Sequence, residues 1–187
     1  MFDFQAENGM VPDCVFRDTL LEKHNWRDRK PPLATWAVWH IYQQTQDLDF
    51  LREMFPKLEK YHRWWFLFRD HDGNGRCEYG STDGTLVAAK WESGMDNAVR
   101  FDSAQLLQNP QGGWSLDRES VDLNSFLEQE ARLLADMADR LQLTGGTELR
   151  RRANQLREQI NSEFYDPMDG WFYDRKLASG DLVRVKG

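Results

Sequence analysis

Trp91-Glu92-Ser93-Gly94-Met95-Asp96-Asn97-Ala98-Val99-Arg100-Phe101-Asp102 is the stretch of this chain on which the interpretation of the rest depends. It gathers three acidic side chains, an arginine, an amide and two aromatic rings, and its apolar residues follow neither the helical nor the strand period. The stretch therefore predicts a shaped loop, and such loops often carry function. It offers both apolar-flanked and arginine-flanked carboxylates to a ligand, although an ion-paired surface loop explains the composition equally well.

The run Glu92-Ser93-Gly94-Met95-Asp96-Asn97, followed by Arg100-Phe101-Asp102, resembles the signature of glycoside hydrolase family 63, the processing α-glucosidases. It is more distantly similar to the matching segment of family 37 trehalases. In those families the aspartate of the signature is the general acid, so the resemblance places this role on Asp96. It also implies an all-α fold, part of an (α/α)6 toroid, and an inverting mechanism.

Inversion needs a carboxylate base about 6.5–9.5 Å from the acid. In the resembled family the base is a glutamate late in the toroid, and no residue of this sequence can be matched to it. Glu92 and Asp102 lie close to Asp96 in the sequence, so we expect ion pairs or amide contacts from both. We therefore expect residues 1–187 to form a single segment, about half of such a catalytic domain.

Two features predict contacts with a sugar. Residues 25–32 are similar to the trehalase segment that supplies amide and cationic contacts, although Arg29-Lys30 stands where trehalases favour Ser-Gln. Aromatic side chains can stack on sugar rings, and the signature adds an amide and a cation. The candidates for substrate binding are Arg27, Lys30, Trp36, Trp91, Asn97 and Arg100. For Arg27 a solvated charge run is the alternative, and for Trp36 packing in the core.

The segment Asp70-His71-Asp72-Gly73-Asn74-Gly75-Arg76-Cys77-Glu78 places oxygen-bearing side chains at every second position, as in an EF-hand-type calcium loop. Calcium is therefore the expected cofactor. Its predicted ligands are the side chains of Asp70, Asp72, Asn74 and Glu78 and the carbonyl oxygen of Arg76. Ser81 stands where an EF-hand has a bidentate glutamate, so a simple acidic turn is the alternative.

Apolar periodicity predicts helices over residues 33–45, 47–55, 56–69, 119–143 and 148–164. Asp47, Ser120 and Thr147 are the expected N-caps, and Pro56 is expected to open the third helix. The first helix is apolar on most faces and is expected to be buried nearly all round. A short β-hairpin is expected to pair residues 171–173 with 182–185. We also expect an exposed apolar edge around residues 33–42 and 121–141, covered by the rest of the barrel or by a second chain.

The net charge of −7 and the pI near 5.1 argue against a nucleic-acid partner and fit an oligosaccharide or a small glycoside. The N-terminus does not resemble a signal peptide and no apolar run is long enough for a membrane span, so as written we expect a cytoplasmic chain. The expected function is hydrolysis of α-linked glucosides or oligosaccharides. The alternatives are a non-catalytic, calcium-stabilised helical fragment that binds a sugar or a partner chain, and a trehalase-like hydrolase.

Overall fold

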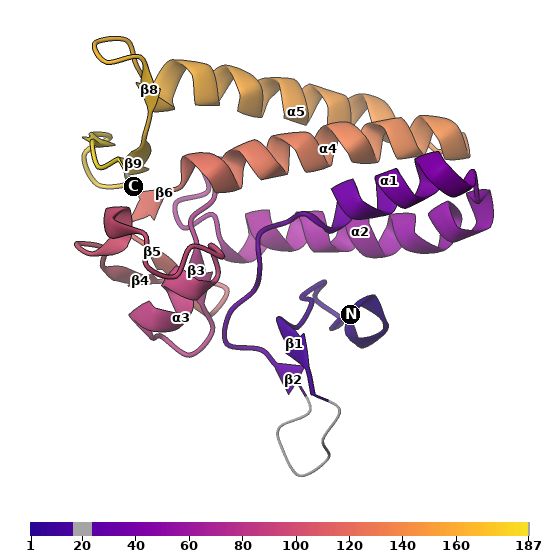
Figure 1. Ribbon diagram of the computed structural model, residues 1–187, viewed down its shortest axis with the longest axis horizontal. Helices are drawn as coiled ribbons and strands as arrows, with labels where there is room; N and C mark the ends of the chain where they lie inside the picture. Colours follow the sequence, from indigo (N-terminus) through magenta and orange to yellow (C-terminus); the bar gives the residue numbers. More distant parts are fainter. Residues whose placement is uncertain (17–23, 187) are drawn as a thin grey trace.

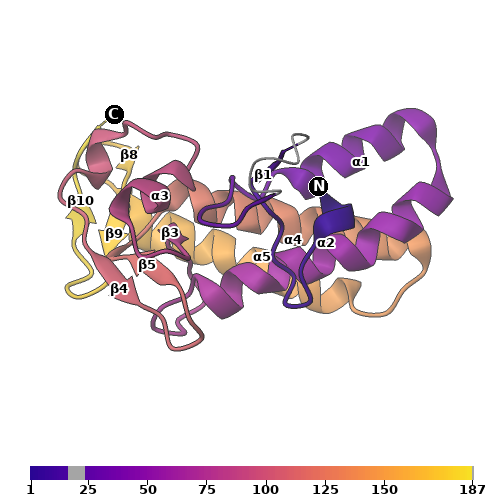
Figure 2. The ribbon, with the colours of Figure 1, turned by 90° about the horizontal axis from the view of Figure 1, so that it is seen from below.

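The computed structural model describes residues 1–16 and 24–186 of the chain. Its frame consists of the helices α1 (Ala34–Thr45), α2 (Leu48–Phe68), α4 (Val121–Leu141) and α5 (Gly146–Gln159). Helices α1 and α4 run in one direction and α2 and α5 in the other, so the chain moves through two antiparallel helix pairs (Figure 1). The tight connections within the pairs lie at one end of the molecule, and α3 (Leu86–Trp91) with most of the strands lies at the other (Figures 1 and 2).

Both tight connections begin in the same way. Gln46 and Gln142, which follow α1 and α4, each have a φ of 56°, in the left-handed region. After Gln46 the predicted N-cap Asp47 is confirmed, because its carboxylate accepts hydrogen bonds from the backbone amides of Asp49 and Phe50 at 3.0 and 2.9 Å. The prediction for Thr147 is wrong, since α5 begins at Gly146 and Gly145 occupies the N-cap position. Ser120 stands at the N-cap of α4 but makes no side-chain cap bond.

The expected break at Pro56 does not occur, and α2 is one helix. A proline inside a helix lacks one backbone hydrogen bond and costs about 3 kcal/mol. The cost is offset here by packing on both sides of the proline, because Leu51, Phe55 and Leu58 join one buried cluster with Leu134 and Met137 of α4. Tertiary burial has therefore outweighed the local preference.

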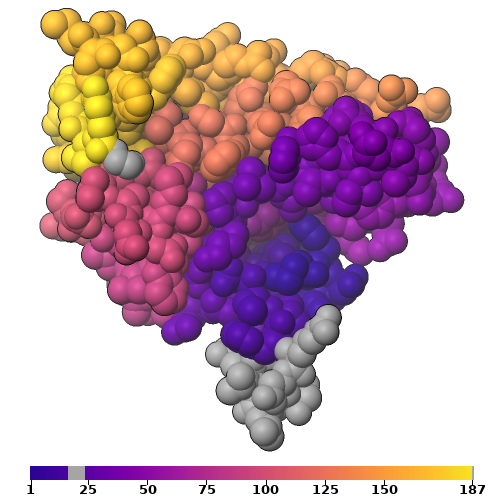
Figure 3. Space-filling view, viewed as in Figure 1, coloured from indigo at the N-terminus to yellow at the C-terminus, as the bar shows by residue number. Residues whose placement is uncertain are grey.

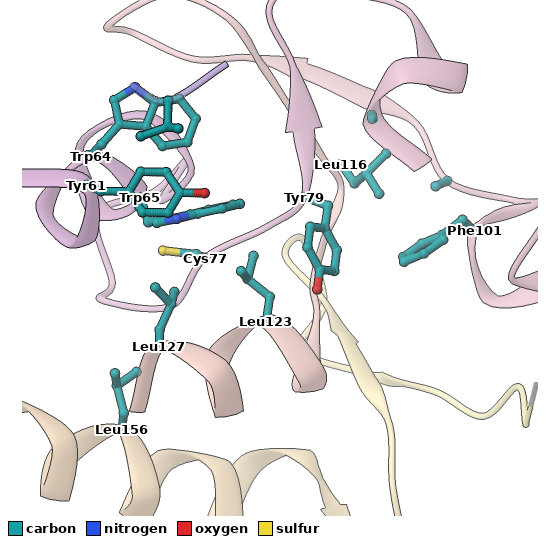
Figure 4. Packing of buried hydrophobic residues seen from close by; sticks show 13 residues of the cluster. Tyr61, Trp64, Trp65, Cys77, Tyr79, Phe101, Leu116, Leu123, Leu127 and Leu156 are labelled. Carbon is teal, nitrogen blue, oxygen red and sulfur yellow. The ribbon is translucent and has the colours of Figure 1, made fainter. Parts of the chain in front are cut away.

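A second buried cluster lies where α2 enters the loop region, and it joins α2, α4 and α5 to that region (Figure 4). Trp64 and Trp65 lie in it almost without exposure, which confirms that they are packing residues. Cys77 is a buried free thiol in the same cluster, and Cys14 is a half-buried one. Further members are Tyr61, Tyr79, Phe101, Leu116, Leu123, Leu127 and Leu156.

The expected exposed apolar edge is present on α1 but not on α4. Helix α1 buries only Thr35, Val38 and Tyr42, while Trp36 and Ile41 remain 46% and 49% exposed, so it is not buried all round. Helix α4 shows no such edge, because α1, α2 and α5 pack against it and cover its apolar stripe. That a further part of the barrel or a second chain covers the exposed face of α1 stays a prediction.

The strands form small antiparallel sheets that periodicity largely missed. One has the order β3-β5-β4, with β3 (Gly80–Ser81), β5 (Trp114–Leu116) and β4 (Leu106–Gln108). Another has the order β10-β9-β6, with β10 (Leu182–Val183), β9 (Asp174–Lys176) and β6 (Arg118–Glu119). Short pairs join β1 (Cys14–Val15) to β2 (His24–Asn25) and β7 (Tyr165–Asp166) to β8 (Trp171–Phe172). The expected C-terminal hairpin exists, but its first strand is residues 174–176 rather than 171–173, because Trp171 and Phe172 pair with β7 instead.

The remaining elements are single turns. They are η1 (Phe2–Phe4), η2 (Val99–Phe101) and the π-helical turn η3 (Ile160–Phe164) that prolongs α5. Within the described residues, every helix is too short or too polar to cross a bilayer. The C-terminal strands, the residues near 80–115 and the start of α4 form one continuous block at one end of the molecule (Figure 3).

Candidate active site

Glu92 fixes the beginning of the signature loop inside the protein. Its carboxylate accepts hydrogen bonds from Nε and Nη2 of Arg69 at 2.7 and 2.9 Å and from the backbone amide of Gly80 at 2.6 Å. Both side chains of this ion pair are almost fully buried, and the Arg69 guanidinium also lies over Trp64. A side chain at Gly80 would meet the carbonyl oxygen of Trp114 at 1.9 Å, so only glycine allows this approach. The expectation that Glu92 makes ion pairs is confirmed.

The signature loop and residues 25–32 lie side by side at Lys30 and Pro31. The Lys30 ammonium donates to the carbonyl oxygen of Trp91 at 3.3 Å. One turn later, a side chain at Gly94 would contact Pro31 at 3.5 Å. Two of the segments predicted to bind sugar therefore form one surface.

Sequence reasoning missed the partners of Lys30. Its ammonium lies 3.5 Å from a carboxylate oxygen of Asp13 and 3.5 Å from one of Asp28, and the Asn25 amide donates to both carboxylates at 3.1 and 2.9 Å. The pairing of β1 with β2 brings Asp13 to Asn25, and a non-local pairing of two-residue strands leaves little signal in a sequence. Asp13 and Lys30 also line a cavity of about 270 Å³ beside Tyr61 and the first turn of α1.

Asp96 and its neighbours in the signature loop are exposed to solvent. Asp96 and Asn97 are exposed, and Trp91 is 42% exposed at the end of α3. Asp102 is exposed and accepts a hydrogen bond from Lys90 at 2.9 Å. The role of Asp96 as general acid stays a prediction.

Arg100 is held by two carboxylates. Its guanidinium donates to Asp122 at 2.8 Å and to Asp174 at 3.2 Å, and only 11% of its side chain is exposed. Asp174 also accepts the backbone amide of Val121 at 3.0 Å, while burial raises the pKa of Asp174 to about 6 despite the neighbouring Arg100. The Tyr79 hydroxyl donates to Asp122 at 3.2 Å.

Two further candidates lie on exposed surfaces. Arg27 is exposed next to the half-buried Trp26. Trp36 lies on the open face of α1, with its ring edge-on to His40 at 4.8 Å between ring centroids. Trp36 is therefore not packed in the core that the described residues form, and sugar binding by both residues stays a prediction.

The predicted calcium loop is compact and rich in internal hydrogen bonds. The Asp70 carboxylate accepts the backbone amides of Asn74 and Gly75 at 3.0 and 2.8 Å. The Asn74 amide donates to Asp72 at 2.9 Å and to Glu119 at 2.7 Å, so Glu119 is a distant acid that approaches the loop. Within residues 1–16 and 24–186, no three His, Cys, Asp or Glu side chains are arranged to hold a metal ion. A cation here would depend on the oxygen atoms of Asn74 and of the Arg76 carbonyl.

Glu78 is the loop residue that best fits a cation. It is fully buried, one carboxylate oxygen accepts the backbone amide of His71 at 3.0 Å, and the other has no hydrogen-bond partner among the described residues. Burial raises the pKa of Glu78 well above its usual range, and burial also raises the pKa of Asp70. An oxygen atom left unpaired in the interior is costly, and a bound cation would satisfy it.

Comparison with known proteins gives a consistent family. The model of the mannosylglycerate hydrolase MGH1-like glycoside hydrolase domain matches residues 1–187. Mannosylglycerate hydrolase MGH2 of Selaginella moellendorffii is 31% identical over 120 residues, 54% of this chain and 22% of that protein. Glucosylglycerate hydrolase of Mycolicibacterium hassiacum is 30% identical over 129 residues, 54% of this chain and 27% of that protein.

Solved structures agree on the fold. The family 63 mannosylglycerate hydrolase of Thermus thermophilus in complex with Tris superposes with a TM-score of 0.76 at 19% identity, over 99% of this chain and 57% of that one. Its complexes with glucose and with Tris and D-glycerate give TM-scores of 0.73 and 0.72. The chain thus spans about half the length of these structures. The resemblance to family 63 and the fold as part of an (α/α)6 toroid are confirmed, and the likeness to trehalases stays a prediction.

Proposed function

Since the chain belongs to the mannosylglycerate hydrolase MGH1-like glycoside hydrolase family, we propose that it forms the acid-bearing part of an inverting glycoside hydrolase. Its substrates are α-linked hexosides, and the relatives make glucosylglycerate and mannosylglycerate the first to test. Asp96 is the general acid. The base belongs to a part of the toroid that this chain does not span.

The observation that supports this proposal is that the signature loop is held in place by contacts with the helical frame and with residues 25–32. Glu92 holds its beginning through Arg69 in the interior, and Lys30 joins Trp91 to residues 25–32. Asp96 lies between the buried Glu92 and the half-buried Arg100 in the sequence, and Asp96 itself is exposed. An acid must be held within a fraction of an ångström of its productive position, and a loop held on both sides of an exposed acid can do this.

The residues of this surface can divide the reaction between them. Protonated Asp96 donates its proton to the glycosidic oxygen as the bond to the anomeric carbon breaks, while a water molecule activated by the base attacks from the opposite face. Trp91 stacks on the apolar face of the sugar ring. Hydrogen bonds to the sugar hydroxyl groups come from Asn97, Lys30 and Arg27. Trp36 contacts the sugar from the exposed face of α1.

Calcium is part of the proposal as a structural ion. Asp70, Asp72, Asn74 and Glu78 would hold it with the Arg76 carbonyl oxygen, and the unpaired oxygen of Glu78 is the observation that favours it. Its contribution is positive charge beside the buried carboxylate of Glu78 and the half-buried one of Asp70. The loop then fixes the chain between α2 and β3, ahead of the Gly80 amide that binds Glu92.

The test measures sugar release and its stereochemistry. The protein, together with the part of the toroid that carries the base, is incubated with glucosylglycerate and with mannosylglycerate, and NMR records the anomer that forms first. We expect the inverted anomer, and about a 10²–10⁴-fold loss of kcat in Asp96→Asn, the range that general acid catalysis contributes. Asp102→Asn is the matched control, because it removes an exposed carboxylate of the same loop.

Three outcomes would contradict the proposal. The retained anomer would exclude inversion, and unchanged turnover in Asp96→Asn would exclude the acid. Sugar binding by calorimetry without any release would favour the non-catalytic alternative.

A further inference from the structure

Arg100 connects three segments that lie far apart in the sequence. It belongs to η2, four residues after Asp96, whereas Asp122 lies in the first turn of α4 and Asp174 in β9. We propose that Asp122 and Asp174 are positioning residues, which hold the Asp96 loop against α4 and the C-terminal hairpin through Arg100. The inference rests on the proposed function for its catalytic consequence, but not for the contact itself.

The geometry leaves little freedom to the guanidinium. The two carboxylates occupy Nη1 and Nη2 of Arg100 at 3.2 and 2.8 Å, and the Asp174 side chain is fully buried. Ion pairs removed from solvent are weakly screened, so breaking one partner costs more than at the surface. Arg100 is thus engaged inside the protein, and in this arrangement it acts through the loop rather than by binding sugar.

A second set of contacts fixes the backbone at the same place. The buried Arg118 of β6 donates from Nη1 to the carbonyl oxygen of Arg100 at 2.6 Å. Phe101 is fully buried with its ring edge-on to Tyr79 (Figure 4). The Tyr79 hydroxyl donates in turn to Asp122. Side chain, backbone and the next residue therefore all tie η2 to the start of α4.

The hold depends on charge. Two carboxylates face one guanidinium, and Arg100 Nε, Asp122 Oδ1 and Asp174 Oδ2 have no hydrogen-bond partner in residues 1–16 and 24–186. The groups that face Asp174 are Arg100 from η2, Asp122 and the Val121 amide from α4, and Arg118 from β6. Because the pKa of Asp174 is raised to about 6, its attraction for Arg100 weakens as the pH falls through this value.

The experiment separates positioning from folding with two measurements. The first is hydrogen exchange of the amides of residues 95–102 at pH 7.5, where we expect about 10-fold faster exchange in Asp174→Asn and in Asp122→Asn, because the loop opens locally. The second is steady-state kinetics, where we expect kcat to fall about 10-fold while KM changes less than about 2-fold. Trp91 and Lys30 still bind the sugar in these variants, but the acid is displaced.

The matched control is Asp166→Asn. Asp166 is also a buried aspartate paired with an arginine, but its partner Arg184 lies in the C-terminal segment and not in the loop. Exchange in residues 95–102 and kcat should stay as in the original chain. At pH 5 the amides of residues 95–102 in the original chain should exchange almost as fast as those of Asp174→Asn measured at the same pH. At pH 7.5, Asp174→Glu should have a higher kcat than Asp174→Asn.

The outcomes distinguish this inference from the proposed function. If no sugar is released by the original chain but exchange rises in the two variants, the positioning contact stands and the proposed function fails. Unchanged exchange in both variants, or an equal change in Asp166→Asn, overturns the inference whatever the activity. Melting curves by circular dichroism identify a variant that unfolds. In that case the exchange and kinetics of the other variant test the inference.

Discussion

Arg69 and Glu92 form a two-point ion pair in the interior, with Nε and Nη2 of the arginine 2.7 and 2.9 Å from the two carboxylate oxygens. The arginine ends α2 and the glutamate follows α3, so the pair joins the helical frame to the signature loop. The acidic residue nearest to Asp96 on its N-terminal side therefore serves the structure of the loop. Of the four charged groups of the signature, Asp96 and Asp102 are exposed, Glu92 is buried, and Arg100 is half-buried.

Replacing Glu92 by glutamine should destabilise the protein strongly. The change leaves the Arg69 guanidinium buried without a negative partner, which typically costs about 3–5 kcal/mol. Urea denaturation followed by tryptophan fluorescence measures the loss. Glu59→Gln is the control, because its pair with Arg63 is exposed and is expected to contribute below about 1 kcal/mol. A loss in Glu92→Gln no larger than in the control would show that the buried pair does not hold the loop.

Calcium should raise the melting temperature and a chelator should lower it. An ion that binds only the folded state at 100 times its dissociation constant adds about 2.7 kcal/mol. Asn74→Ala and Glu78→Gln should remove the response to calcium, while Asp49→Asn on the exposed first turn of α2 should keep it. Differential scanning calorimetry with and without calcium provides the measurement. A melting temperature that responds to neither calcium nor chelator favours the acidic turn.

Asp174 should give the stability a characteristic pH dependence. Its pKa is raised from 3.8 to about 6 by burial, so between these values the folded state keeps a proton that the unfolded state has lost. Stability contributed by this group is thus present at low pH and falls as the pH rises from about 4 to 6, by up to about 1.4 kcal/mol per pH unit. Denaturation curves at several pH values should show a shallower decline in Asp174→Asn. The raised pKa values of Asp70 and Glu78 act in the same direction and remain in the variant, so an identical slope would contradict the assignment to Asp174.

Trp91 should contribute to substrate binding without supporting the fold. It is 42% exposed beside Lys30, so Trp91→Ala should leave the melting temperature within about 2 °C but raise KM roughly 5- to 30-fold through the lost stacking. Trp171→Ala is the matched control, because Trp171 is a similarly exposed tryptophan on β8. Equal effects of the two replacements on KM would exclude a specific contact at Trp91.

Local signals in the sequence were sufficient for the helical frame. An apolar stripe and the carboxylate of Asp47 define where helices run and begin, because both act within one or two turns of the chain. They were insufficient at Pro56, where contacts from α4, far along the chain, override the proline. Two-residue strands such as β6 and β9 have no period to detect, so the sheet that carries Asp174 could not be expected.

In the candidate site, too, local features could be predicted from the sequence and tertiary contacts could not. The signature predicted which residues share a loop, and the contact between Lys30 and Trp91 shows that residues 25–32 lie beside it. The sequence did not indicate Asp13 or Asp174, because each reaches its partner only through tertiary pairing. Arg100 was predicted to bind the sugar because it is a cation in a functional loop, and the two carboxylates that pair with it come from segments far along the chain.

The two glutamines with left-handed backbone conformation mark the end of the molecule that is best suited to modification. Gln46 and Gln142 reverse the chain at the end opposite to α3 and the signature loop, and their side chains lie at or near the surface. Glycine adopts this conformation without the strain that a side chain adds, so each turn can accept glycine or a short glycine-rich insertion. This end of the molecule is therefore the place to attach a fluorophore, a surface tether or a fused domain, because such an attachment leaves the path to Asp96 open.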